Sequence, residues 1–250
     1  MIRRVCLFAA VLALVSLSAP GVARAGDGDP VLLKLDDATN RAGDFQASVK
    51  AITVIPGRSP LEMAFRLQVK GPRRLVDFEA PGDMKGTRVL VLDRTQMYVY
   101  LPAYNKVRRV ASHVNNQGFM GTMFADADMA TSRYAEAYEA KLLNETAEVW
   151  TIALTPKPGA EVAYPKLEVA VRKADSLPNE VRYFNAKGEK IKTETRSDYA
   201  CKGDICIPGT LKMVDHTKGD AHTTLTQSVQ GINTGLSEDL FSQRNLQRGP

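Results

Sequence analysis

The stretch LEMAFRLQVK, residues 61–70, decides how this sequence folds. Leu61, Met63, Phe65, Leu67 and Val69 are all apolar, and most of the residues between them are charged or polar. Successive side chains of a strand point to opposite faces, so this alternation predicts a strand with one face in a core and the other in water.

The same period of two returns along most of the chain after residue 45. Glycine, proline, asparagine and aspartate separate the alternating runs at about the spacing of hairpins. Further strands are predicted at residues 75–80, 88–93, 97–101, 107–111, 138–143, 150–155, 167–172, 181–184, 191–199, 211–216 and 223–229. At least eleven antiparallel strands, nearly all with one apolar face, favour a mainly β fold built on one curved sheet or barrel with one dry face.

Helical segments are few and short. Asp29 suits a helix cap and Pro30 the first turn, and apolar residues then follow at i, i + 4 and i + 7 before Gly43 ends the pattern. A helical turn is also expected within 128–136, and a last short helix within 237–246. No tandem repeat or linker is found, so residues 26–250 are expected to form a single domain.

The first 25 residues are typical of a cleaved export signal. A basic start, MIRR, precedes an apolar run from Val5 to Ala19, and small residues at Ala23 and Ala25 suit cleavage after Ala25. The run is shorter than the roughly 20 residues that a membrane-spanning helix needs, which disfavours an anchor. We therefore expect a protein of the periplasm.

Composition excludes one class of partner and predicts one crosslink. The formal charge of +5 falls to +2 without the three arginines of the signal, which gives no support to nucleic-acid binding. Cys201 and Cys206 then remain as a pair around a Gly203-Asp204 turn, and in an oxidising compartment they predict a structural disulfide. A redox or metal pair fits less well, since the spacing is not C-x-x-C and no histidine lies between them.

Catalytic and cofactor motifs are not found. The three histidines belong to no metal-binding pattern, and the sequence contains no G-x-S-x-G elbow, phosphate-binding loop or dinucleotide fingerprint. We expect no enzyme activity, no metal and no cofactor.

Two basic clusters are candidates for docking. The first is Arg73-Arg74, and the second contains Lys106, Arg108 and Arg109. They are either solvated strand ends or contacts to an anionic membrane or an acidic partner, where a basic side chain contributes about 1 kcal/mol.

The stretch GFMGTMFADADMA, residues 118–130, is too apolar for an ordinary solvated loop. Phe119, Met120, Met123 and Phe124 either plug one end of the sheet as core or form an adjustable lid over a cavity. Methionine repacks easily around ligands of variable shape, and the neighbouring glycines permit movement. The lid is the favoured interpretation.

Several ordered motifs resemble the outer-membrane lipoprotein-sorting family of LolA-like periplasmic carriers. They are K-G-T at 85–87, Y-L-P at 100–102, R-R-V at 108–110, F-M-G at 119–121, YFNAKGEKIK at 183–192 and the tail LSEDLFSQRNL at 236–246. The family's S-D-F is Thr122-Met123-Phe124 here, so an acidic group of the loop is missing. The resemblance covers most of residues 45–246.

The resemblance implies a half-open, strongly curved antiparallel barrel with a few short helices over its concave side. It also implies a carrier that moves acyl chains of lipoproteins or envelope lipids toward the outer membrane, with an inner-membrane transporter and an outer-membrane acceptor as partners. The residues expected to bind ligand as cavity wall or lid are Met63, Phe65, Leu67, Val91, Val99, Phe119, Met120, Met123, Phe124 and Trp150.

Two other functions remain open at this point. A structural or adaptor protein of an envelope complex predicts a filled barrel without a cavity. A hydrolase of lipid or glycan predicts a nucleophile with a neighbouring base, which the sequence does not present.

Overall fold

A computed structural model describes residues 26–110, 118–131 and 133–248. The expected export signal, residues 1–25, lies outside these ranges.

The helices are α1 (Asp29–Thr39), α2 (Asp126–Ala130) and α3 (Gln243–Arg248), with short 3-10 turns η1 (Pro102–Tyr104), η2 (Phe119–Gly121), η3 (His216–Lys218) and η4 (Glu238–Phe241). The strands are β1 (Asp44–Val54), β2 (Leu61–Lys70), β3 (Arg73–Ala80), β4 (Arg88–Asp93), β5 (Gln96–Leu101), β6 (Lys106–Arg109), β7 (Tyr138–Glu145), β8 (Val149–Pro156), β9 (Lys166–Arg172), β10 (Pro178–Phe184), β11 (Lys190–Ser197), β12 (Ala200–Lys202), β13 (Ile205–Ile207), β14 (Thr210–Asp215) and β15 (Ala221–Ile232). Among the described residues, no helix is both long and apolar enough to cross a membrane.

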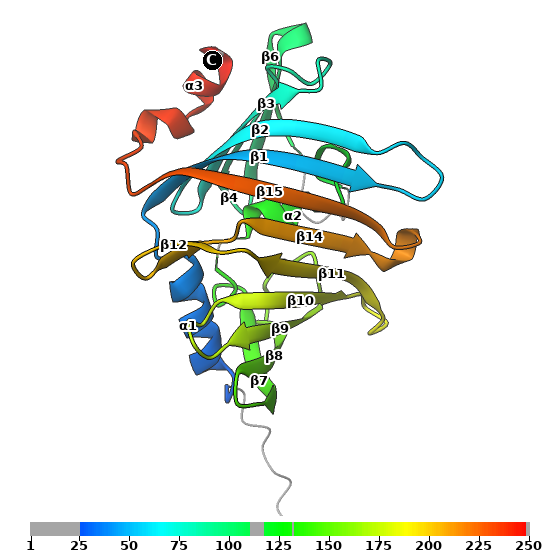
Figure 1. The fold of residues 1–250 in the computed structure, drawn as a ribbon, viewed down its shortest axis with the longest axis vertical. Coiled ribbons are helices and arrows are strands. Elements are labelled where there is room, and N and C mark those ends of the chain that lie inside the picture. Colours follow the sequence, from blue (N-terminus) through cyan, green and yellow to red (C-terminus); the bar gives the residue numbers. More distant parts are fainter. Residues whose placement is uncertain (1–25, 111–117, 132, 249–250) are drawn as a thin grey trace, which may run out of the picture.

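Thirteen of the strands form one antiparallel sheet. Its order is β6-β5-β4-β3-β2-β1-β15-β14-β11-β10-β9-β8-β7, and β12 pairs with β13 as a separate hairpin. The sheet curves strongly but stays open between its edge strands β6 and β7 (Figure 1). The prediction of a single curved antiparallel sheet is confirmed, and the barrel is not closed.

The alternation of β2 sets the two faces of the sheet. Met63 and Phe65 are buried on the concave face, opposite Ala51 and Val49 of β1. Arg66, between them and Val69, lies on the convex face and pairs with Glu79 of β3. Nearly every other strand repeats this pattern, so the concave face carries two large apolar clusters, one toward each edge of the sheet.

Helix α1 covers the concave side next to the β7 edge. The prediction of a helix from Asp29 is confirmed, but the prediction of Asp29 as its cap is wrong. Gly28 holds the cap position without a side-chain bond, and the Asp29 carboxylate instead accepts the Ala140 N–H of β7 at 2.7 Å. A Cβ atom on Gly28 would lie 2.8 Å from the carbonyl carbon of Lys141, so only glycine permits this close approach.

The C-terminal tail packs on the convex face instead. Phe241 and Leu246 are buried against Leu75 and Leu90, the convex residues of β3 and β4. The buried guanidinium of Arg88 also donates to the Asn245 carbonyl oxygen at 2.7 Å. The red helix α3 therefore lies on the opposite side of the sheet from α2 (Figure 1).

Leu246→Ala is expected to lower the free energy of unfolding by about 2–5 kcal/mol, because it opens a cavity at a fully buried position. Leu143→Ala is the matched control, since Leu143 is 48% exposed and its truncation should cost less than about 0.5 kcal/mol. Urea denaturation of both variants measures the difference. Equal losses would mean that the tail contributes nothing to the fold.

Candidate functional site

A cavity of about 210 Å³ lies on the concave face between the two halves of the sheet. Five tyrosines from separate parts of the chain line it, and we call it the tyrosine cavity: Tyr134, Tyr138, Tyr164, Tyr183 and Tyr199. Apolar side chains of β1, β2, β9, β14 and β15 complete much of the wall. Burial raises the pKa of each of these tyrosines, so the phenols stay neutral near neutral pH.

A second cavity, of about 30 Å³, lies beside the first. We call it the phenylalanine cavity after Phe65, Phe78, Phe119 and Phe124, which line it. The two cavities have five lining residues in common, namely Leu67, Phe124, Met129, Leu225 and Gln227. These shared side chains form the partition, so a movement of the partition would join the two spaces.

The loop that supplies Phe124 is tightly closed on itself. The Phe119 N–H donates to the Phe124 carbonyl oxygen at 2.6 Å, and the Thr122 hydroxyl donates to the Phe119 carbonyl oxygen at 2.7 Å. A Cβ atom on Gly118 would lie 2.1 Å from the Thr122 carbonyl oxygen, so this closure requires glycine. The Met123 N–H donates to the Thr223 hydroxyl of β15 at 2.9 Å, which fastens the loop to the sheet.

The structure brings together five of the ligand-binding residues predicted from sequence. Met63, Phe65, Leu67, Phe119 and Phe124 all line one or both cavities.

The other predicted residues lie elsewhere. Val91, Val99 and Met120 belong to the apolar cluster around the phenylalanine cavity but are not part of its lining. Met123 is buried in the neighbouring cluster. Trp150 lies near the β7 edge, where its indole N–H donates to Glu145 at 3.2 Å and Lys34 and Lys173 flank its ring.

The charged groups of the site were not predicted from the sequence. Lys192, Glu194 and Arg196 alternate along the concave face of β11, and the last two line the tyrosine cavity. Glu194 accepts hydrogen bonds from the Tyr183 hydroxyl at 2.5 Å and from Arg196 Nε at 2.6 Å. The spacing of the three charged residues, every second position within 190–197, could have indicated that they share one face of the strand. Because they are charged, that face was expected to be the one in contact with water.

Asp128 is the second carboxylate of the tyrosine cavity. It accepts the Ala125 N–H at 2.7 Å, as a cap of α2, and the Tyr164 hydroxyl at 3.3 Å. Burial raises its pKa to about 6, against the opposing attraction of Lys192. The carboxyl therefore titrates within the range of physiological pH.

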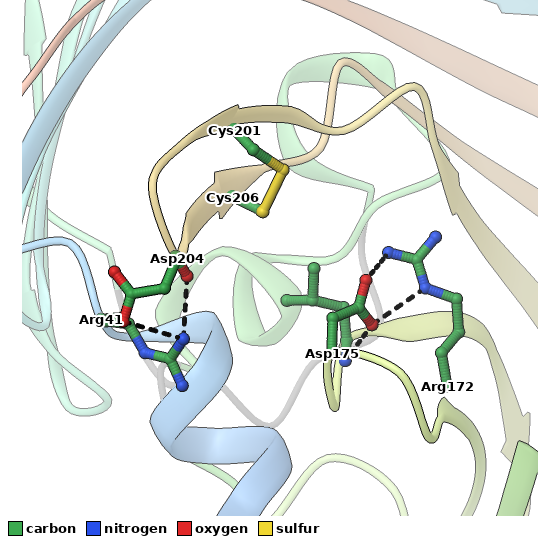
Figure 2. Close-up of a disulfide and its surroundings, with 7 residues drawn as sticks. Arg41, Arg172, Asp175, Cys201, Asp204 and Cys206 are labelled. Carbon is green, nitrogen blue, oxygen red and sulfur yellow. Dashed lines mark hydrogen bonds and ion pairs between the residues drawn. A yellow bond between two sulfur atoms is a disulfide. The ribbon is translucent and has the colours of Figure 1, made fainter.

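The hairpin of β12 and β13 forms part of the rim of this cavity. Cys201 and Cys206 lie opposite each other and form a disulfide, which confirms the prediction (Figure 2). Cys206 lines the cavity, and Arg41, just after α1, donates to the Asp204 carbonyl oxygen at 2.8 Å. The crosslink and this contact together hold the rim against α1.

Comparisons with known proteins agree with this architecture. A family model described only as that of an uncharacterized protein matches residues 71–248, and no curated protein matches the chain. Among solved structures, a domain assigned to the outer membrane lipoprotein-sorting proteins of Vibrio parahaemolyticus is 25% identical, with a TM-score of 0.79, and the match covers 89% of this chain and 100% of that one. A DUF1329 family protein from Desulfovibrio piger is 22% identical, with a TM-score of 0.78 and coverage of 88% and 97%. A LolA superfamily protein from Nitrosomonas europaea is 20% identical, with a TM-score of 0.71 and coverage of 87% and 98%.

Asp128→Asn is expected to flatten the dependence of stability on pH between about 4 and 7. The pKa of this carboxyl is about 6 in the folded state, above its ordinary value of 3.8, so the folded state holds the proton more tightly than the unfolded state. As the pH rises through this window, the wild type loses stability, on the order of 2 kcal/mol, whereas asparagine keeps an acceptor for the Ala125 N–H and does not titrate.

Urea denaturation at about pH 4.5 and about pH 7.5 tests this expectation. Asp37→Asn serves as the control, because its side chain is 70% exposed. A difference between wild type and Asp128→Asn that does not change with pH would contradict the titration of Asp128.

Proposed function

We propose that this chain, which shares its fold with outer membrane lipoprotein-sorting and LolA superfamily structures, is a non-enzymatic periplasmic carrier of acyl chains. The observation that supports this proposal best is the tyrosine cavity, which the concave face leaves unfilled. Cargo would be acyl chains of lipoproteins or lipids of the envelope, moved toward the outer membrane.

The wall of the two cavities suits an acyl chain. Leu67, Phe124 and Leu225 offer apolar surface to both spaces. Each methylene that leaves water contributes about 0.8 kcal/mol, so a single chain binds usefully without a directional contact. Carriage of this kind needs no catalytic group.

The loop at 118–125 gives the site a way to adapt. The tyrosine cavity alone is smaller than the roughly 300–1,000 Å³ of common ligand pockets. Movement of Phe124 and Met129 would join it to the phenylalanine cavity. We propose that the loop acts as an adjustable lid in this sense, with Met120 and Met123 following its movement.

The two rival functions have less support. An adaptor with a filled barrel does not account for the tyrosine cavity. One set of residues resembles the nucleophile, base and acid of a hydrolase. His216 lies 2.9 Å from the Thr193 hydroxyl and 2.7 Å from the Asp220 carboxylate. Thr193 alternates with the concave residues of β11 and so faces away from the cavity, and the set therefore does not support acyl-chain hydrolysis there.

Leu67→Trp is expected to weaken binding of a fluorescent acyl probe at least tenfold, because the larger ring fills space that both cavities share. Overpacking costs about 1–3 kcal/mol of stability, so the variant should remain folded. Leu143→Trp, at an exposed position, is the control and should bind like wild type. Native mass spectrometry of protein from cell envelopes adds a direct readout, with bound lipid expected in the wild type. Absence of probe binding and of bound lipid in the wild type would favour the adaptor.

Transfer between membranes also requires docking, and the basic edge strand β6 is the proposed place. Lys106, Arg108 and Arg109 are all exposed there. Arg108 lies over the ring of Tyr104, and Arg109 donates to the Thr95 carbonyl oxygen at 3.1 Å. Basic side chains on an edge strand also discourage pairing with another sheet, which is the simpler explanation of the cluster.

Changing Arg108 and Arg109 together to Gln is expected to weaken binding to anionic liposomes about tenfold or more and to flatten its salt dependence. Low ionic strength, about 0.01 M, suits the measurement because screening of exposed charges is weak there. Lys187→Gln with Lys190→Gln removes the same charge from another exposed turn and should bind like wild type. Equal binding by all three proteins would leave the arginines as solvated residues of the edge strand.

A further inference from the structure

Arg74 lines the tyrosine cavity without forming an ion pair to either of the two carboxylates that line it. Arg74 of β3 and Arg196 of β11 both line it, with Glu194 and Asp128 as its carboxylates. Glu194 is held by Arg196 and Tyr183, and Asp128 interacts with Lys192 and Tyr164. Arg74 is the cation left over.

Arg74 makes contacts with carbonyl groups instead. It donates to the carbonyl oxygens of Pro72 at 3.0 Å and Thr131 at 3.4 Å. No carboxylate oxygen of the described residues forms an ion pair with it. Burial, together with repulsion from Arg196, lowers its pKa to about 10, so the guanidinium is charged at neutral pH and is poorly compensated.

The expectation that Arg74 belongs with Arg73 in a surface cluster is therefore wrong. The two side chains leave β3 on opposite faces, and Arg73 forms its ion pair with Glu238 of the tail. Arg74 opposes Val69 and Val91 and faces into the cavity. A cation in this position costs free energy unless an anion joins it.

The concave surface becomes apolar along β3 from Arg74 toward Phe78. Arg74, Val76 and Phe78 alternate along the concave face of β3, and the last two are buried. Phe78 lies about 13 Å from Arg74 at the rise of an extended strand, and it lines the phenylalanine cavity. Phe65 opposes Phe78 on β2, with 5.3 Å between the ring centroids. A ligand with one charged end and an apolar chain matches this gradient.

We propose that Arg74, assisted by Arg196, binds the oxoanion head of an anionic amphiphile whose acyl chain extends toward the phenylalanine cavity. The proposal rests on the carrier function and names its cargo class as lipids with a free carboxylate or phosphate head. A guanidinium presents a planar fork of N–H donors that matches such oxoanions. Arg196 donates from Nε to Glu194, and its terminal nitrogens are directed to no acceptor in the described part of the chain. An acyl group joined through an ester or amide carries no charge at its carbonyl, so Arg74 binds it less strongly than a free carboxylate or phosphate.

Competition against a fluorescent acyl probe tests the proposal at pH 7.5, with hexadecanoate and hexadecanol as matched competitors, each kept below the concentration at which it aggregates. Wild type should prefer the carboxylate about tenfold, which corresponds to about 1.4 kcal/mol. Arg74→Gln should lose that preference while its affinity for hexadecanol stays within twofold, and Arg74→Lys should recover part of the preference. Arg66→Gln is the charge-matched control, since Arg66 is 54% exposed on the convex face.

The outcomes separate the anion site from the carrier function. If wild type binds hexadecanol and hexadecanoate equally, the anion site is overturned and the carrier function stands. If neither competitor displaces the probe, the carrier function itself fails. If Arg74→Gln weakens the binding of both competitors alike, Arg74 holds the polypeptide backbone around Thr131 in place and does not bind the charged head of the ligand. If inorganic phosphate displaces hexadecanoate at a similar concentration, the site binds a small free anion, and the proposal that it binds an amphiphile is wrong.

Discussion

The pairing of β1 with β15 is the constraint on which the rest of the structure depends. It joins the strands of the N-terminal half to those of the C-terminal half, with residues such as Ala51 and Leu225 directly opposite each other. A buried hydrogen bond of 2.8 Å between the hydroxyls of Thr53 and Thr223 lies within this junction. Thr223 also accepts the Met123 N–H, so the same point fixes the two halves of the sheet and the loop over its concave face.

The alternation of apolar and polar residues predicted most of the sheet, because a strand with one buried face has an apolar side chain at every second position. It could not predict the charged groups on the concave face, since Lys192 and Glu194 are buried against partners that lie on other elements of the fold. Asp128 and Tyr183 supply those partners, and pairing of this kind leaves no local signal. Asp29 is a similar case, because its carboxylate serves a strand more than a hundred residues away instead of its own helix.

The residues of the site also divide into those that the sequence could predict and those that it could not. Phe65 and Leu67 were predictable from alternation, and Phe119 and Phe124 from an apolar loop with glycines. Trp150 was not, since an aromatic residue on a concave strand position can either line a cavity or close the edge of the sheet between two lysines. Which of the two occurs depends on the position of α1, which supplies one of those lysines.

The loop at 118–125 combines a firm interior with few attachments to the sheet. Its hydrogen bonds between Phe119, Thr122 and Phe124 would move with it as a unit. The bond from Met123 to Thr223 is the backbone contact that such a movement would break, at a net cost of about 0.5–1.5 kcal/mol. Exposure of the apolar side chains would cost more, about 1.5–3 kcal/mol for each large one. An acyl chain entering between the cavities would cover the same side chains again, so the ligand itself supplies the apolar contact that the displaced loop gives up.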